Sequence, residues 1–164
     1  MITFVTQTTS LSDSYKLGTI QDVVDYCSTK DILGVDTETE GFDFTCKKMI
    51  MFQIGDENQQ FVIDTRFVSI EPLRNILESK DIVKIFHNAK FDLAFFEYHF
   101  NFKFPRFEDT MLLHYLIDEN PGGHGLKQLS MHFTPYGDYE KPMYDWMDKY
   151  RKEHGMLKGD FTWD

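Results

Sequence analysis

Hydrophobic residues follow two different spacings along this 164-residue chain, and the spacings predict strands and helices in turn. Apolar runs at 32–38, 48–54 and 60–63 predict three strands joined by short connections, which is typical of an antiparallel meander. Two more short strands are expected at 2–5 and 82–86. Together these segments indicate a mixed sheet of about five strands, the first three antiparallel.

Apolar residues three and four positions apart predict helices in the remaining segments. Thr19 is a candidate N-cap for one helix, and Ser69 for another that has Pro72 in its first turn, where proline is tolerated. A meander followed by alternating helices and strands indicates an α/β fold with helices flanking the sheet. The helices are expected at 19–29, 70–78, 88–100, 109–118, 125–132 and 140–154.

Composition and charge narrow the class of protein. With 41% hydrophobic residues and 16 Phe, the chain can bury a substantial core and is not expected to be disordered. No apolar run approaches the roughly 20 residues of a membrane helix, and we expect no signal peptide. Cys27 and Cys46 form neither a disulfide framework nor a zinc pattern, so we expect reduced thiols in a cytoplasmic protein. The net charge of −10 argues against a module that binds duplex nucleic acid by bulk electrostatics.

Three carboxylates stand where strands are expected to end. Asp36 and Glu38 close the apolar run 32–38, and residues i and i+2 of a strand point to the same face. Asp92 lies in the first turn of the helix after strand 82–86, and sites in α/β sheets gather at the carboxyl ends of strands. Carboxylates are hard ligands for Mg²⁺ or Mn²⁺, which bind phosphodiesters and activate water. The pattern therefore favours a metal-dependent nuclease.

These residues also have ordinary structural interpretations. Asp36 and Glu38 could instead cap the loop that follows their strand. Asp92 stands where an acidic side chain favours the helix dipole, and Asn88 stands where an N-cap is expected. A second acidic pair with the same spacing, Asp138 and Glu140, follows a turn, and we interpret it as solvated surface.

Two of these segments also match known motifs. Val-Asp-Thr-Glu-Thr at 35–39 and His-Asn-Ala-Lys-Phe-Asp at 87–92 resemble the first two exonuclease motifs of the DEDD superfamily. Phe-Glu-Asp-Thr-Met-Leu-Leu at 107–113 and His-Gly-Leu-Lys-Gln-Leu at 124–129 resemble the segments that follow those motifs. The likeness is nearest to the 3′→5′ proofreading domain of family A DNA polymerases, including those of phages, although ribonuclease D-type enzymes share the motifs.

The resemblance implies a ribonuclease H-like fold and hydrolysis with two Mg²⁺ or Mn²⁺ ions. By position, it implies that Asp36 bridges both metals, that Glu38 holds the metal of the attacking hydroxide, and that Asp92 holds the other. Asp109 matches no metal ligand of the family, and we expect it to cap a helix. The residues that would lie near the terminal nucleotide are Thr37, Phe42, His87, Asn88 and Phe91.

A third motif, which supplies the fourth carboxylate in the family, is not evident. The one Tyr-x-x-x-Asp match, Tyr144 to Asp148, lies among charged residues rather than in an apolar helix, and we interpret it as surface. We therefore predict an exonuclease-like domain at 1–133 and a connector at 134–164 that leads toward the missing motif. The chain is then a fragment of a longer exonuclease-polymerase, a split protein whose fourth acid comes from another polypeptide, or a degenerate module.

The predicted function is 3′→5′ exonuclease activity that releases nucleoside 5′-monophosphates from single-stranded or frayed DNA 3′ ends. The expected partners are a polymerase domain or another replication protein. The expected setting is the cytoplasm, in the nucleoid or in phage replication, with no membrane. One alternative is a catalytically incomplete fragment or binding module of a replication polymerase, and another is a ribonuclease D-like enzyme that trims RNA.

Overall fold

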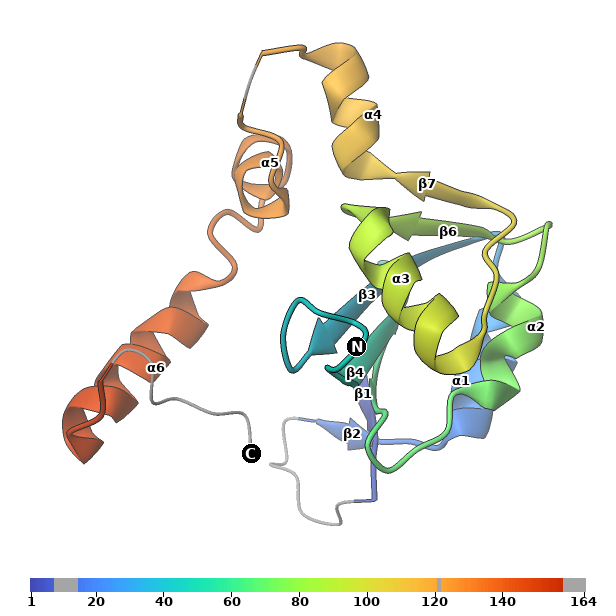
Figure 1. Cartoon of the computed structure of the whole chain (residues 1–164), viewed down its shortest axis with the longest axis horizontal. Coiled ribbons are helices and arrows are strands. Elements are labelled where there is room, and N and C mark those ends of the chain that lie inside the picture. Colours follow the sequence, from blue (N-terminus) through green and yellow to red (C-terminus); the bar gives the residue numbers. More distant parts are fainter. Residues whose placement is uncertain (8–14, 121, 158–164) are drawn as a thin grey trace. The chain divides into compact units, whose positions relative to one another are not determined.

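A computed structural model describes residues 1–7, 15–120 and 122–157 of the chain. The contacts between residues divide the chain into two compact units, Met1–Ile117 and Asp118–Asp164. The first unit holds the sheet and the second is helical (Figure 1). The boundary predicted at residue 133 was drawn between sequence motifs rather than folded units, and it stays a prediction.

The strands of the first unit form a single mixed sheet. They are β1 (Ile2–Val5), β2 (Lys16–Leu17), β3 (Ile32–Thr39), β4 (Met49–Gly55), β5 (Gln60–Asp64), β6 (Val83–Phe86) and β7 (Phe107–Asp109). Their order in the sheet is β2-β1-β5-β4-β3-β6-β7. β3, β4 and β5 pair antiparallel, which confirms the meander, and the other pairs are parallel. The sheet has seven strands rather than about five, because β2 and β7 are too short to show an apolar alternation.

All six predicted helices are present, and their bounds agree with the prediction within two residues. The first unit contains α1 (Ile20–Cys27), the 3₁₀ turn η1 (Glu71–Leu73), α2 (Arg74–Leu77), α3 (Ala89–Phe100) and α4 (Thr110–Ile117). The second unit contains α5 (Leu126–Phe133) and α6 (Lys141–His154). The segment predicted as one helix at 70–78 is a 3₁₀ turn that continues into a single α-helical turn.

The predicted caps are partly confirmed. Thr19 begins α1 with a capping box, in which its Oγ1 accepts the Asp22 N–H at 3.2 Å and the Asp22 carboxylate accepts the Thr19 N–H at 2.7 Å. Ser69 lies one residue too early to be the N-cap of its helix, although its Oγ accepts the Glu71 N–H at 3.3 Å. Pro72 lies in the first turn, as expected.

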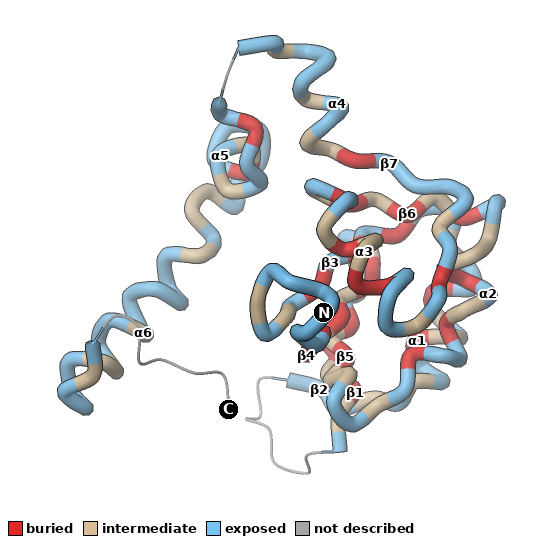
Figure 2. Tube along the Cα trace, viewed as in Figure 1, coloured by how far each residue is buried: buried red, intermediate tan, exposed pale blue. Residues whose placement is uncertain are grey.

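Helices cover the face of the sheet that β3 buries. Leu33, Val35 and Thr37 are buried, and they alternate with exposed residues on the opposite face of the strand. The buried side chains of α1, α2 and α3 join those of the strands in one core. Figure 2 shows these buried positions along the strands and the three helices, whereas α4 and α6 have no buried residue.

Aromatic rings fill the space between the sheet and α3. The rings of Phe52 on β4 and Phe96 on α3 meet edge to face, with centroids 5.2 Å apart. Phe104 joins them from the chain after α3, 5.0 Å from Phe96 and 5.5 Å from the ring of Phe86 on β6. These contacts pack α3 against β4 and β6, the two neighbours of β3 in the sheet.

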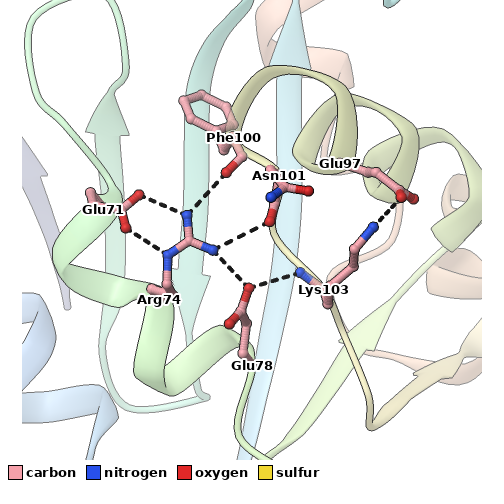
Figure 3. Close-up of polar contacts among 7 residues, drawn as sticks. All are labelled: Glu71, Arg74, Glu78, Glu97, Phe100, Asn101 and Lys103. Carbon is pink, nitrogen blue, oxygen red and sulfur yellow. Dashed lines mark hydrogen bonds and ion pairs between the residues drawn. The ribbon is translucent and has the colours of Figure 1, made fainter.

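Arg74 ties the C-terminal end of α3 to α2. Its guanidinium pairs with Glu71 through two nitrogens, at 2.6 and 3.0 Å, and with Glu78 at 2.8 Å (Figure 3). The same group donates to the carbonyl oxygens of Phe100 at 3.1 Å and Asn101 at 3.3 Å. The last carbonyls of a helix lack partners within the helix, so Arg74 satisfies groups that α3 cannot.

An ion-pair group organises the second unit. Lys127 on α5 contacts Asp138 at 3.0 Å and Glu140 at 3.7 Å, and its ammonium lies 5.3 Å from the ring centre of Tyr144 on α6. The acidic pair that we interpreted as solvated surface is therefore partly buried and paired. It joins the two helices of this unit.

The two thiols lie in different surroundings. Cys27 on α1 is buried, and burial raises the pKa of its thiol to about 12. Cys46 is exposed in the connection between β3 and β4. Among the described residues, no helix combines the length and the apolar character needed to cross a bilayer.

We expect the Arg74→Lys variant to have a lower melting temperature than the wild type. Lysine keeps the charge, but it cannot bond two carboxylates and two carbonyl oxygens at once. Thermal unfolding followed by circular dichroism at low and high salt measures the change. Arg66→Lys is the matched control, because Arg66 also bonds a carboxylate, that of Asp64, through two nitrogens. A loss no greater than that of Arg66→Lys would show that the contacts of Arg74 contribute little.

Candidate active site

Three parallel strands end at the same edge of the sheet. β3 pairs in parallel with β6, and β6 pairs in parallel with β7. The residues at or just after their carboxyl ends therefore lie near one another, and they include the three motifs singled out in the sequence. This edge is the candidate active site.

Asp36 and Glu38 lie on one face of β3, as their spacing predicts. Both are exposed, whereas Thr37 between them is buried on the opposite face. Protein atoms partly desolvate the carboxylate of Asp36, which raises its pKa, while the Thr37 N–H and His87 oppose that shift.

Asp92 is the buried carboxylate of the site. Its side chain is 3% exposed, in the first turn of α3, and its Oδ1 accepts the hydroxyl of Thr37 at 2.6 Å. The pKa of Asp92 is raised to about 7, mainly by burial and in part by the nearby carboxylate of Asp36, while the Thr37 bond acts in the opposite direction. Thr37, predicted to lie near the nucleotide, thus has a structural contact inside the domain.

The predicted carboxylates are only partly brought together. Asp36 and Asp92 lie close enough for their charges to interact. However, among the described residues no three His, Cys, Asp or Glu side chains converge closely enough to hold a metal ion. The reason is local, because the alternation of β3 directs Thr37, rather than Asp36 or Glu38, toward Asp92.

Asp109 caps two helices at once. Its Oδ1 accepts the N–H groups of Asn88, Met111 and Leu112 at 3.0, 2.9 and 3.3 Å, and its Oδ2 accepts that of Ala89 at 2.8 Å. Asn88 and Ala89 stand at the start of α3, and Met111 and Leu112 stand in the first turn of α4. The predicted cap is therefore confirmed, and it serves two helices. Burial would raise the pKa of Asp109, but the four N–H donors together lower it.

Asn88 stands at the N-cap position of α3, but its side chain makes no capping bond. Its backbone has a left-handed conformation, with φ of 66°, which asparagine tolerates better than most residues. This conformation turns the chain sharply from β6 into α3 and presents the Asn88 N–H to Asp109. The side-chain cap that we expected from Asn88 is therefore supplied to α3 by Asp109, at the end of β7.

His87 is held by Thr110, a residue that the sequence analysis did not single out. The Thr110 hydroxyl donates to the Phe86 carbonyl oxygen at 3.0 Å, and it lies 2.9 Å from His87 Nδ1. Because the hydroxyl has one proton, Nδ1 must donate to it, which fixes the tautomer of a neutral His87. A threonine directly after a strand that ends at this edge was the available signal.

Two aromatic residues, which we expect to lie near the terminal nucleotide, are close to this edge. Phe42, in the connection after β3, is 91% exposed, and its ring meets the ring of Phe91 edge to face at 6.1 Å. Phe91 on α3 is half-buried and rests on Phe95 at 5.1 Å. Phe42 therefore offers a ring face to solvent.

The Tyr-x-x-x-Asp match lies on α6 in the second unit. Tyr144 and Asp148 are both exposed, and Asp148 pairs with Arg151 one turn further along. This placement agrees with our interpretation of the pair as surface.

Comparison with known families gives one match that covers most of the chain. A family model described as 3′-5′ exonuclease matches residues 15–156. The matched range includes all three predicted carboxylates, the Asp109 cap and both helices of the second unit.

Two DNA polymerases are similar to part of the chain. The DNA polymerase of Escherichia phage T5 is 43% identical over 103 residues, which are 59% of this chain and 12% of that protein. DNA polymerase I of Aquifex aeolicus is 40% identical over 86 residues, which are 52% of this chain and 14% of that protein. The chain thus spans about an eighth of the length of these relatives.

A solved structure shares the fold. Brucella melitensis NrnC with bound Mg²⁺ superposes with a TM-score of 0.61 at 18% identity, and the match covers 96% of this chain and 84% of that one. This likeness supports the ribonuclease H-like α/β fold that was expected.

We expect Asp109→Asn to destabilise the protein by about 1–3 kcal/mol at pH 7, because an amide presents only one accepting oxygen to the four N–H groups. The wild-type carboxylate has a lowered pKa in the folded state, so its contribution is present above the unfolded pKa of about 4 and is lost below it. Urea unfolding of both proteins from pH 7 to pH 3 measures the difference. A gap that does not shrink in acid would contradict the cap.

We expect Asp92→Asn to stabilise the metal-free protein at pH 8. The raised folded pKa of Asp92 means that the wild type loses stability as the pH rises from about 4 to 7, whereas an amide does not titrate. The gain reaches about 2–4 kcal/mol above pH 7 and vanishes near pH 4. Urea unfolding in EDTA across this pH range measures the difference in unfolding free energy. Equal stabilities at pH 8 would show that the ionised Asp92 carboxylate does not destabilise the fold.

Proposed function

The chain belongs to the 3′-5′ exonuclease family of family A DNA polymerases, and we propose that it removes nucleotides from DNA 3′ ends. The substrate is a single-stranded or frayed end, and the product is a nucleoside 5′-monophosphate. The observation that carries this proposal is the buried Asp92 carboxylate, held beside Asp36 at the edge where β3, β6 and β7 end.

The surroundings of Asp92 suit a divalent cation. Its carboxylate accepts the Thr37 hydroxyl, and the carboxylate of Asp36 lies close enough for the two charges to repel. Hard cations take carboxylate oxygens, and a cation would reverse the raised pKa of both residues. Asp36, Glu38 and Asp92 would hold Mg²⁺ or Mn²⁺, two ions in all. The bound ions would activate water and stabilise the leaving 3′ oxygen.

The other residues of the edge position the terminal nucleotide. The exposed ring of Phe42, beside the half-buried ring of Phe91, would stack on any base, so the site would be tolerant of sequence. Asn88 and His87, at the turn from β6 into α3, lie beside the same edge and would contact the terminal nucleotide. Thr37 acts through Asp92, whose carboxylate it orients.

The net charge of −10 leaves little electrostatic affinity for DNA. We therefore propose that a polymerase domain or another replication protein, in a cytoplasmic setting, delivers the 3′ end. The identified relatives are DNA polymerases far longer than the matched segment.

A second function has an observation in its favour. Because no three ligand side chains converge among the described residues, the chain fits a catalytically weak module that binds a primer end. Such a module would need a further carboxylate from another polypeptide before it could hydrolyse DNA. Metal titration separates the two functions, since only the exonuclease binds two Mn²⁺ ions together with a DNA end.

We expect the protein to shorten a 5′-labelled single-stranded DNA from its 3′ end with Mg²⁺ or Mn²⁺, and not with EDTA. Asp36→Ala should abolish this activity while the circular dichroism spectrum stays unchanged. A denaturing gel of the time course provides the measurement, with an RNA of the same sequence beside the DNA.

Asp138→Ala is the matched control, since Asp138 belongs to the second acidic pair, which the sequence analysis does not assign to the site, and it pairs with Lys127. It should degrade DNA at the wild-type rate. Activity that survives in Asp36→Ala would refute the assignment of the site. Inactivity of the folded wild type would favour the binding module, and faster loss of the RNA would favour an RNA-trimming enzyme.

A further inference from the structure

The loop between β3 and β4, residues 40–48, carries an unusually exposed aromatic side chain. Phe42 is 91% exposed, although it is energetically unfavourable for a phenylalanine ring to stay in water. The rings of Phe42 and Phe91 meet edge to face with their centroids 6.1 Å apart, and nearly all of the Phe42 side chain stays exposed. How firmly the loop holds Phe42 therefore decides how well that ring can serve a ligand.

Hydrogen bonds inside the loop fix its shape. The Asp43 carboxylate accepts the N–H and the hydroxyl of Thr45 at 3.0 and 2.6 Å, and the Asp43 carbonyl oxygen accepts the N–H groups of Cys46 and Lys47. At the base of the loop, the Glu40 N–H donates to the Lys48 carbonyl oxygen at 3.0 Å. The loop is a closed turn.

The same loop is fastened to the last turns of α3. His99 Nε2 donates to the carbonyl oxygen of Lys47 at 2.9 Å, and the His99 ring stacks on Phe95 at 5.8 Å. Phe44 of the loop packs against the ring of Phe95 at 6.3 Å and that of Tyr98 at 5.7 Å. α3 thus carries Phe91 and Asp92 in its first turn and the anchor of the loop two turns later.

We propose that His99 is a positioning residue, which fastens loop 40–48 to α3 so that Phe42 stands ready to stack on the base at a nucleic-acid 3′ end. The proposal rests on the proposed function and deepens it. His99 acts through the backbone of Lys47 and touches no substrate. Because one rigid helix sets both positions, the separation between the stacking ring and the Asp92 carboxylate is fixed before a strand arrives, which lowers the entropy lost on binding.

The test compares His99→Leu, which cannot donate to the Lys47 carbonyl oxygen, with His99→Gln, whose amide can. In steady-state degradation of oligothymidylate, His99→Leu should raise KM about fivefold and change kcat less than about twofold, because it weakens binding rather than chemistry. His99→Gln should restore most of the wild-type KM. In a Phe42→Ala background, His99→Leu should have no further effect.

A second measurement does not depend on activity. Trypsin cleaves after lysine, so the metal-free His99→Leu protein should be cut after Lys47 or Lys48 faster than the wild type, and His99→Gln should not. Unchanged KM and unchanged cleavage in His99→Leu would overturn the proposal, as would an equal effect of His99→Leu in the Phe42→Ala background. If the wild type degrades no DNA, the proposed function fails. Fluorescence anisotropy of labelled oligothymidylate in Ca²⁺ then replaces KM in the same comparison.

Discussion

The candidate site depends on one carboxylate that does not belong to it. Asp109 ends β7 and accepts four backbone N–H groups from the first turns of two helices. Helix N-termini leave such groups without partners, and burying them unpaired would destabilise the domain. By satisfying both helices, Asp109 fixes where α3 begins relative to β6 and β7. The position of Asp92, one turn into α3, follows from that junction.

α3 is therefore fastened by charged side chains at both ends. Asp109 holds its N-terminal end, and Arg74 bonds the carbonyl oxygens of Phe100 and Asn101 at the other. This support, with the aromatic packing against the sheet, lets the helix carry a buried carboxylate at its first turn. A buried charge of this kind destabilises the fold, and such unfavourable features are typical of functional sites, where a ligand can compensate for them.

The sequence predicted those parts of the molecule that local patterns determine. The apolar alternation of β3 placed Asp36 and Glu38 on one face, and the 3.6-residue spacing located every helix within two residues. Local sequence patterns could not predict contacts between distant segments of the chain. The Thr37–Asp92 bond joins residues 55 positions apart, and Thr110 reaches His87 across two strand ends. Asn88 looked like a side-chain cap, but its left-handed backbone passes that role to Asp109.

The difference in burial between the two thiols allows loop 40–48 to be labelled selectively. Cys27 lies in the core with its thiol held protonated, so an electrophile reaches it only when the domain unfolds. Cys46 is exposed, and it lies within loop 40–48 itself. A maleimide dye added to the native protein would attach at that one position, four residues from Phe42. The unaltered sequence thus contains a site-selective attachment point for a fluorescent reporter, beside the ring that is proposed to meet a base.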